Sequence, residues 1–212
     1  MKIICTKFGY YNSLHNNNIK KTLIESSAKT EYPVLYLKPD SSIQKGGKPF
    51  YIPDFSADIR CKIGLIVKID RLGKNIGKKF AHRYYNEIAV GVNLTAHDVE
   101  IDLKERGLPG DLSQNFDYST ILGDFVGIKT LGKGLNDLSL SLSVNESVQQ
   151  KSAIDNLEDI IDKTIAYASC FFTLKIGDLF FFDLQESETA LKIGDHVTGK
   201  TENQLLVDFH VR

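Results

Sequence analysis

The chain has 212 residues, of which 42% are hydrophobic and 25% charged, as in one globular domain or at most two small ones. Its 27 acidic and 26 basic side chains leave a net charge of −1, which excludes a polybasic nucleic-acid-binding domain. No apolar run approaches the roughly 20 residues of a membrane-spanning helix, and the first residues, MKIICTKF, do not make a signal peptide. We therefore expect a cytoplasmic protein without nucleic-acid or membrane partners.

Short runs of β-branched and aromatic residues recur along the chain and are mostly bounded by glycine, proline, asparagine or aspartate, as strands are. The run at 138–144 reads LSLSLSV, and this strict alternation predicts a strand with one buried and one solvated face. In chain order, the predicted strands include residues 2–5, 34–37, 63–69, 88–92, 138–144, 179–182 and 204–211.

Helical patterns are fewer, and they predict helices over 77–86, 96–106 and 157–170. The second follows Thr95-x-x-Asp98, which resembles a capping box, and Gly107 is placed to end it. Many strands with a few irregularly spaced helices favour a mixed α/β fold that is mostly β, and they disfavour a doubly wound parallel sheet.

The three cysteines, Cys5, Cys61 and Cys170, lie far apart and include no C-x-x-C pair. This spacing indicates neither a disulfide framework nor a structural zinc site. Because apolar residues flank each cysteine, we expect three buried thiols that pack as small hydrophobic side chains.

The sequence contains no short motif that by itself indicates phosphate binding, metal binding or nucleophilic catalysis. The glycines at 46–47 and 132–135 are not arranged as a phosphate-binding loop. The five histidines form no H-E-x-x-H motif and no i,i+4 pair, and no D-x-D or E-x-E pair lies on a strand. G-x-S-x-G is also missing. These residues alone indicate only a soluble, β-rich domain.

Longer segments carry a more specific pattern. The blocks NLTAHD at 93–98 and KERGLP at 104–109 are its most distinctive parts. Around them lie PVLYLKPDSSI (33–43), KPFYIPDFSADI (48–59), RCKIGLIVKI (60–69), LSLSLSVNESVQQ (138–150) and LKIGDLFF (174–181). In order and spacing, these segments resemble the fumarylacetoacetate hydrolase family over nearly the whole chain.

The resemblance implies a β-sandwich-roll core, a small N-terminal lid subdomain over residues 1–45, a catalytic-fold domain over 46–212, and a homodimer. Members of the family act on 2-oxo acids and diketo acids by hydrolysis, decarboxylation, hydration or isomerisation. They hold Mg²⁺ or Mn²⁺ with three carboxylates, because a hard divalent cation prefers oxygen anions and then polarises the substrate.

Carried over one at a time, the three metal-ligand positions fall on Lys62, Gly64 and Asn93, none of which has a carboxylate. An ammonium about 4 Å from a divalent cation costs several kcal/mol at an effective dielectric constant of about 20. We therefore expect no catalytic divalent metal and no other cofactor.

Other functional positions of the family have changed as well. The catalytic lysine corresponds to Gln114, and the arginine of the D-x-T-A-R-D block corresponds to His97. The T-G-T-P loop that holds the substrate carboxylate falls on residues 182–185, FDLQ, and the lid dyad H-x-x-E falls on His15 and Asn18. Lys38 and Gln150 do follow the family. By position, the candidate catalytic residues are His15, Lys62, His97 and Gln114, and the candidate substrate-binding residues are Lys38, Lys62, Asn93, Gln150 and Asp183.

Two kinds of function remain open. The first is a non-catalytic or ligand-binding homologue, in which Phe180, Phe181 and Phe182 fill the former substrate space. The second is a metal-independent enzyme on a small 2-oxo or diketo acid, in which Lys62 binds the carboxylate directly or forms a Schiff base. A plainer alternative for Lys62 is an ion pair with Asp183 or another acid.

Overall fold

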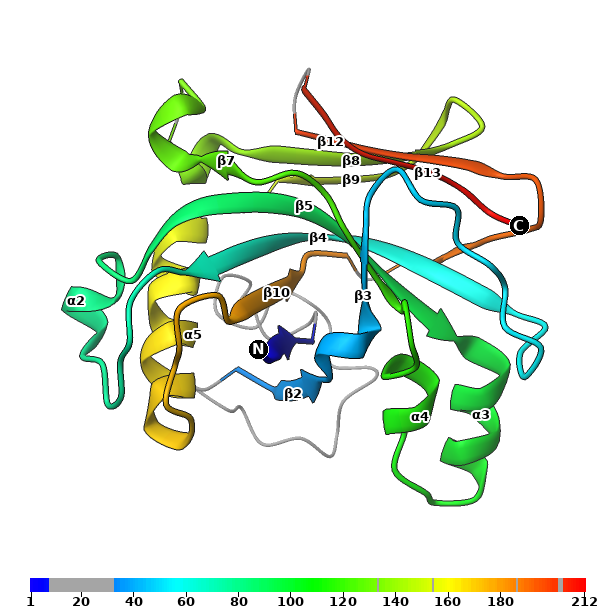
Figure 1. Cartoon of the computed structure of the whole chain (residues 1–212), viewed down its shortest axis with the longest axis horizontal. Coiled ribbons are helices and arrows are strands. Elements are labelled where there is room, and N and C mark those ends of the chain that lie inside the picture. Colours follow the sequence, from blue (N-terminus) through cyan, green and yellow to red (C-terminus); the bar gives the residue numbers. More distant parts are fainter. Residues whose placement is uncertain (8–32, 133, 154, 186, 202–203) are drawn as a thin grey trace, which may run out of the picture.

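The structure is a computed structural model of the whole chain (Figure 1), and it describes residues 1–7, 33–132, 134–153, 155–185, 187–201 and 204–212. The predicted lid residues His15 and Asn18 lie outside these ranges. No helix in the described ranges is long and apolar enough to cross a membrane.

Two sheets hold most of the regular secondary structure in the described chain, so the prediction of a mixed, mostly β fold is confirmed. A nine-stranded mixed sheet has the order β2-β1-β10-β4-β5-β6-β3, with β11 paired to β4 and β7 to β5. Its strands are β1 (Ile3–Thr6), β2 (Leu35–Lys38), β3 (Ile43–Lys45), β4 (Ile59–Ile69), β5 (Tyr85–Ala96), β6 (Thr120–Leu122), β7 (Val126–Gly127), β10 (Leu179–Asp183) and β11 (Thr189–Ala190). The second sheet, in the order β13-β12-β8-β9, contains β8 (Ser139–Val144), β9 (Ser147–Ala153), β12 (His196–Thr201) and β13 (Gln204–His210).

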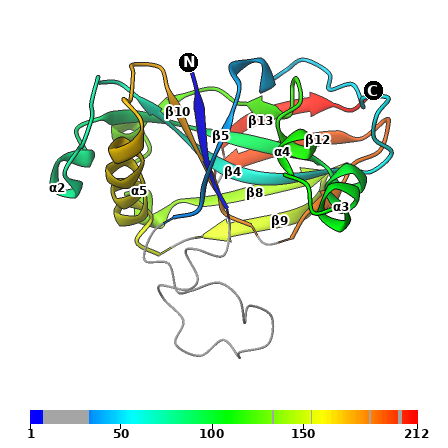
Figure 2. The same cartoon turned by 90° about the horizontal axis from the view of Figure 1, so that it is seen from below.

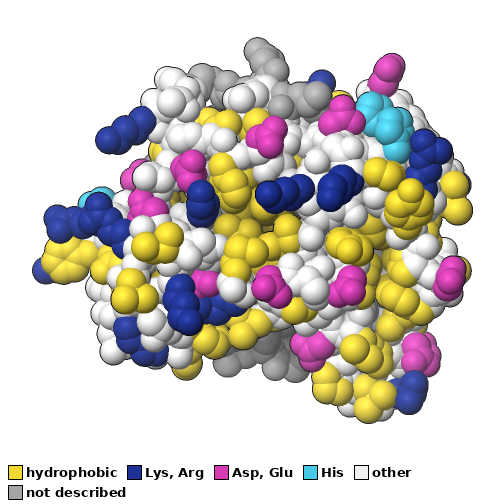
Figure 3. All heavy atoms as spheres, viewed as in Figure 1, with side chains coloured by type: hydrophobic (Ala, Val, Ile, Leu, Met, Phe, Trp, Pro, Cys, Tyr) yellow, Lys and Arg dark blue, Asp and Glu magenta, His cyan; other side chains and the backbone are white. Residues whose placement is uncertain are grey.

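The four-stranded sheet packs over one face of the long strands β4 and β5, while β10, β1 and β2 lie toward their other side (Figure 1). Figure 2 shows α3 (His97–Glu105) and α4 (Asp111–Gln114) at one end of the molecule, with α5 (Leu157–Phe171) and α2 (Lys78–Ala81) at the other. Short 3-10 turns span Asp40–Ser42, Ile128–Thr130 and Leu135–Asp137. Acidic, basic and hydrophobic side chains are interspersed over the surface seen in Figure 3.

The main core lies between the two sheets and is built by the alternating side chains of their strands. In β8, Leu140, Leu142 and Val144 are buried in this core and the intervening serines are partly exposed, which confirms the predicted alternation. A smaller buried cluster lies on the opposite face of β4 and β5. It contains Ile3, Cys5, Ile66, Ala89, Leu179 and Phe181.

The predicted helix over 77–86 is wrong for most of its length. Only α2, a single turn, is helical, and Tyr85 already begins β5, where it is buried and pairs with Ile69 of β4. The long antiparallel pairing of β4 with β5 supplies tertiary contacts and backbone hydrogen bonds that outweigh a weak helical pattern.

The predicted capping box is also wrong. Asp98 accepts hydrogen bonds from Ser56 Oγ at 2.6 Å and from the Ala57 amide at 2.7 Å, and so it fastens the preceding turn to α3. Partial burial acts to raise the pKa of Asp98, but these hydrogen bonds and one from the Val99 amide together hold it below its usual range. Gly107 has φ +64°, a conformation that glycine adopts without strain, and it follows α3 as predicted.

Two of the three thiols are buried as expected, whereas Cys170 is exposed on α5. A helix has a solvent face, and flanking apolar residues do not decide which face a residue occupies. Strands β1, β2 and β3 of the first 45 residues join the nine-stranded sheet. The division into residues 1–45 and 46–212 stays a prediction.

Candidate functional site

The candidate site lies on the face of β4 and β5 that points away from the four-stranded sheet. Lys62 of β4 is directly paired with Asn93 of β5, and Gly64, two residues further along β4, is paired with Asp183 of β10. Because successive side chains of a strand alternate between its faces, Arg60 and Lys62 share this face with Gly64. The pairing of three strands thus brings together residues that are far apart in the sequence.

Lys62 is held between two carboxylates. Its Nζ lies 3.4 Å from Glu188 Oε1 and 3.6 Å from Asp183 Oδ2, and all three side chains are largely buried. Burial raises the pKa of Asp183 to about 6, although the positive charge of Lys62 acts to lower it. The ammonium of Lys62 therefore neutralises acids of the protein itself.

Arg60 does not join Lys62 at this site. Its guanidinium donates to both carboxylate oxygens of Asp58, with Nη2 at 2.8 Å from Oδ2 and Nε at 3.1 Å from each oxygen. This fork-shaped pair raises the pKa of Arg60 and fixes the direction of its donors.

Asn93 belongs to a buried polar chain. Its Oδ1 accepts from Lys38 Nζ at 2.6 Å, and its Nδ2 donates to the hydroxyl of Tyr36 at 3.0 Å. Lys38 Nζ also donates to the carbonyl of Ser119 at 3.0 Å. Burial lowers the pKa of Lys38 to about 7 and raises that of the neighbouring Cys5 to about 12. The amide of Asn93 is thus occupied on both sides by groups of the protein.

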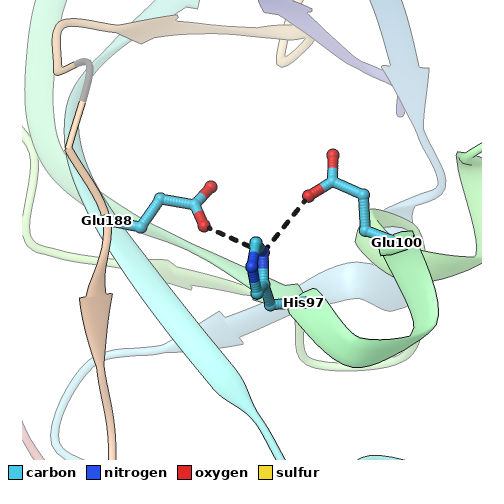
Figure 4. Close-up of side chains that lie close together, drawn as sticks. All are labelled: His97, Glu100 and Glu188. Carbon is cyan, nitrogen blue, oxygen red and sulfur yellow. Dashed lines mark ion pairs between the residues drawn. The ribbon is translucent and has the colours of Figure 1, made fainter. Parts of the chain in front are cut away.

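A second cluster, drawn in Figure 4, contains His97, Glu100 and Glu188, and the last of these also pairs with Lys62. His97 begins α3, Glu100 lies one turn further along the same helix, and Glu188 directly precedes β11. His97 Nδ1 is 3.6 Å from Glu100 Oε2 and 3.6 Å from Glu188 Oε2. Gln114 Nε2 donates to Glu100 Oε1 at 3.4 Å. Three of the candidates chosen by position, Lys62, His97 and Gln114, are therefore linked through Glu100 and Glu188.

The sequence reasoning missed both glutamates of this cluster. His97 and Glu100 are three residues apart, and that spacing on the predicted helix would have placed their side chains on one face. Glu188 carried no comparable signal, because only the antiparallel pairing of β11 with the start of β4 brings it here.

Gln150 is engaged in holding the two sheets together. Its Oε1 accepts from the Ile63 amide at 2.9 Å, and its Nε2 donates to the Cys61 carbonyl at 2.9 Å and to Thr189 Oγ1 at 2.8 Å. From β9 it therefore bonds to β4 and to β11, where Thr189 directly follows Glu188.

Only one of the three consecutive phenylalanines faces the candidate site, so the prediction that all three fill it is wrong. Phe181 packs over Gly64, where an added Cβ would lie 2.5 Å from its ring, and it also closely approaches Gly91. Phe180 and Phe182 point the other way into the main core, with ring centroids 6.2 Å apart. The alternation of side chains along β10 imposes this split.

The residues at the positions carried over from the family do not fit Mg²⁺ or Mn²⁺. Lys62 is a cation, the space above Gly64 is filled by Phe181, and the amide oxygen of Asn93 accepts from Lys38. A hard divalent cation requires several oxygen ligands, and these three positions leave none available.

Comparison with known proteins identifies the class to which this fold and site belong. The family model described as "Fumarylacetoacetate (FAA) hydrolase C-terminal" matches residues 2–205, so the chain belongs to that family. It is 29% identical over 198 residues to oxaloacetate tautomerase YcgM of Escherichia coli (strain K12), covering 93% of this chain and 86% of that protein. It is 26% identical over 209 residues to a mitochondrial oxaloacetate tautomerase of Rattus norvegicus, covering 99% of this chain and 90% of the relative.

Solved structures share the fold. A fumarylpyruvate hydrolase from Pseudomonas aeruginosa, in complex with Mn²⁺ and pyruvate, has a TM-score of 0.79 at 21% identity, covering 99% of this chain and 88% of that one. A crystal structure described as a putative fumarylpyruvate hydrolase from Burkholderia cenocepacia has a TM-score of 0.81 at 24% identity, covering 100% and 88%. At this identity the likeness concerns the fold alone.

Proposed function

We propose that this chain is a member of the fumarylacetoacetate hydrolase family that has lost the Mg²⁺- or Mn²⁺-dependent chemistry of its relatives and serves as a non-catalytic or ligand-binding homologue. The observation that carries the proposal is the ion pairing of Lys62, whose ammonium lies within 3.6 Å of Asp183 and Glu188 where the family resemblance expects a metal ligand.

Two neighbouring positions support the same conclusion. Phe181 fills the space above Gly64, so a longer side chain there would displace an aromatic ring that is fully buried. Asn93 is hydrogen-bonded to Lys38, and a ligand at its oxygen would have to break a buried charge-assisted hydrogen bond. Restoring a three-carboxylate site would therefore require changes at several contacting residues together.

The alternative is a metal-independent enzyme on a small 2-oxo or diketo acid. One observation favours it: burial lowers the pKa of Lys38 to about 7, so a fraction of its amine is uncharged and nucleophilic at neutral pH. Two observations weigh against it. Lys38 is fully buried with two acceptors, and Lys62 is already neutralised by two carboxylates.

The relatives named oxaloacetate tautomerase suggest the substrates to test. We would follow oxaloacetate tautomerisation and decarboxylation, and acylpyruvate hydrolysis, by ultraviolet absorbance with Mg²⁺, with Mn²⁺ and with a chelator. We expect rates equal to those of the protein-free control in all three conditions. Metal-dependent turnover would overturn the proposal. Turnover that resists the chelator but disappears in Lys62→Ala or Lys38→Met would establish the alternative.

Ligand binding is tested on the same protein with oxalate and pyruvate by calorimetry. If Lys62 forms part of a carboxylate pocket, binding should be lost in Lys62→Ala and unaffected by the chelator. We further propose that the protein is a homodimer in the cytoplasm, as the family resemblance and composition suggest. Light scattering after gel filtration tests the first point, and cell fractionation tests the second.

A further inference from the structure

We propose that His97, Glu100 and Glu188 bind a divalent transition-metal ion of the Zn²⁺ type, at a place shifted from the family's three carboxylate positions. This site goes beyond the proposed loss of Mg²⁺- or Mn²⁺-dependent chemistry and does not depend on it. It also departs from our expectation, drawn from the sequence, that the chain holds no metal.

The geometry of the donor atoms carries the proposal. One atom from each side chain, His97 Nδ1 and one carboxylate oxygen of each glutamate, lie within 4.8 Å of one another. His97 Nδ1 is 3.6 Å from each of the two oxygens. Tetrahedral bonds of about 2.0–2.1 Å place two ligand atoms roughly 3.4 Å apart. The two separations from His97 are within a few tenths of an ångström of this value. The two carboxylate oxygens lie within 4.8 Å of each other, so they would have to approach by up to about 1.4 Å to share one ion.

The Nδ1 atom of His97, a possible metal ligand, lies between the two carboxylates of this cluster. This atom is shielded from solvent and makes no hydrogen bond within the described part of the chain. Glu100 Oε2 and Glu188 Oε2 face this atom at 3.6 Å, beyond hydrogen-bond distance. A shielded polar atom without a hydrogen bond costs free energy and calls for an explanation. An ion between the imidazole and the two carboxylates would use this nitrogen and both oxygens.

The charges around the cluster also favour a cation. Three carboxylates, those of Glu100, Asp183 and Glu188, surround one cation, Lys62. With the carboxyls ionised and His97 neutral, two negative charges remain uncompensated, which a divalent ion would balance.

Lys62 need not oppose such an ion, because the Glu188 carboxylate lies between them. Its Oε1 faces Lys62 at 3.4 Å, whereas its Oε2 faces His97 at 3.6 Å. Lys62 would then orient a ligand from the outer shell, as hydrogen-bonded partners of metal ligands commonly do. The side chains of His97, Glu100 and Glu188 are 24%, 33% and 18% exposed, so an ion has access and water can complete its coordination.

The donor set indicates the class of metal. An imidazole nitrogen with two carboxylates suits Zn²⁺ and related transition metals, whereas Mg²⁺ and Ca²⁺ prefer oxygen ligands throughout. The spacing of the first two ligands, i and i+3 on α3, keeps both on one face of a rigid element.

The test is calorimetric titration of the metal-stripped full chain with Zn²⁺, and separately with Mg²⁺. We expect one Zn²⁺ ion per chain, with Mg²⁺ binding far weaker. Co²⁺ in place of Zn²⁺ should give an absorption spectrum that reports a nitrogen ligand, and this spectrum should be lost in His97→Ala. In His97→Ala and Glu188→Gln, Zn²⁺ affinity should fall by more than about 100-fold, because losing even an outer-shell partner costs about 10- to 100-fold.

His196→Ala is the matched control, since His196 is a histidine paired with Asp208 far from this cluster and stacked on His210. It should leave Zn²⁺ binding unchanged. The proposal fails if the wild type does not bind Zn²⁺, if His97→Ala binds it as well as the wild type does, or if His196→Ala abolishes binding. Circular dichroism checks that each variant is folded, and Glu100→Gln replaces any variant that is not.

Discussion

The buried amine of Lys38 makes a sharp prediction about stability and pH. Its side chain is fully buried, and desolvation lowers its pKa from 10.5 to about 7. The unfolded chain therefore holds this proton up to a higher pH than the folded chain does. The free-energy cost of burying the charged amine is therefore complete below pH 7 and disappears as the pH rises toward 10.5. The contribution of Lys38 to the free energy of unfolding thus becomes more favourable as the pH rises through this window.

The size of the effect follows from the two pKa values. One pKa unit corresponds to about 1.4 kcal/mol. Near its midpoint the folded group is half-titrated, and integration from pH 7 to pH 9 gives a gain of about 2 kcal/mol in the free energy of unfolding. Buried thiols such as Cys5, whose pKa burial raises to about 12, oppose this trend above pH 8. The comparison of wild type with Lys38→Met removes their contribution.

The assay is urea unfolding at pH 7 and pH 9, followed by circular dichroism, for wild type, Lys38→Met and Lys45→Met, which replaces an exposed lysine. At pH 7, Lys38→Met relieves the desolvation penalty but leaves the acceptors of Asn93 and Ser119 unpaired. We expect Lys45→Met to follow the wild type, and Lys38→Met to lack the gain of about 2 kcal/mol. If all three proteins respond to pH alike, Asn93 and Ser119 keep the amine protonated and the reasoning is refuted.

Three further predictions concern the candidate site and its supports. Gly64→Ala should lower the free energy of unfolding by about 1–3 kcal/mol, because its Cβ would meet Phe181, whereas Gly110→Ala, in open space, should have little effect on urea unfolding. Gln150→Leu should lower the free energy of unfolding by about 2–4 kcal/mol, because it leaves the Ile63 amide and the Cys61 carbonyl buried without hydrogen-bond partners. A decrease below about 0.5 kcal/mol would mean that water replaces the side chain. Lys62→Met should raise the pKa of Asp183 above its value of about 6, as read from the carboxyl chemical shift in NMR, and an unchanged pKa would show that the pair contributes nothing.

Part of the fold was predictable because local sequence carries it. The alternation over 138–144 fixed which face of β8 is buried, and the apolar stripe over 157–170 anticipated α5 closely. The helix over 77–86 was not predictable in this way. Burial and strand pairing of Tyr85 against β4 decided that segment, and those contacts come from residues distant in the sequence.

The candidate site, too, was only partly predictable from the sequence. The sequence alone determined which chemical groups stand at the positions carried over from the family: an ammonium at 62, no side chain at 64 and an amide at 93. It also supplied the helical spacing of His97 and Glu100. These facts depend only on residue identity and local periodicity, which any reader of the chain can inspect.

Only the tertiary structure decided how those groups are used. Antiparallel pairing of β11 with β4 brings Glu188 beside both Lys62 and His97, and β10 turns Phe181, but not Phe180 or Phe182, toward Gly64. Strand pairing and side-chain alternation set these neighbours, and neither is encoded within a short window of sequence. A chain with balanced charge thereby gathers an excess of acids at one place.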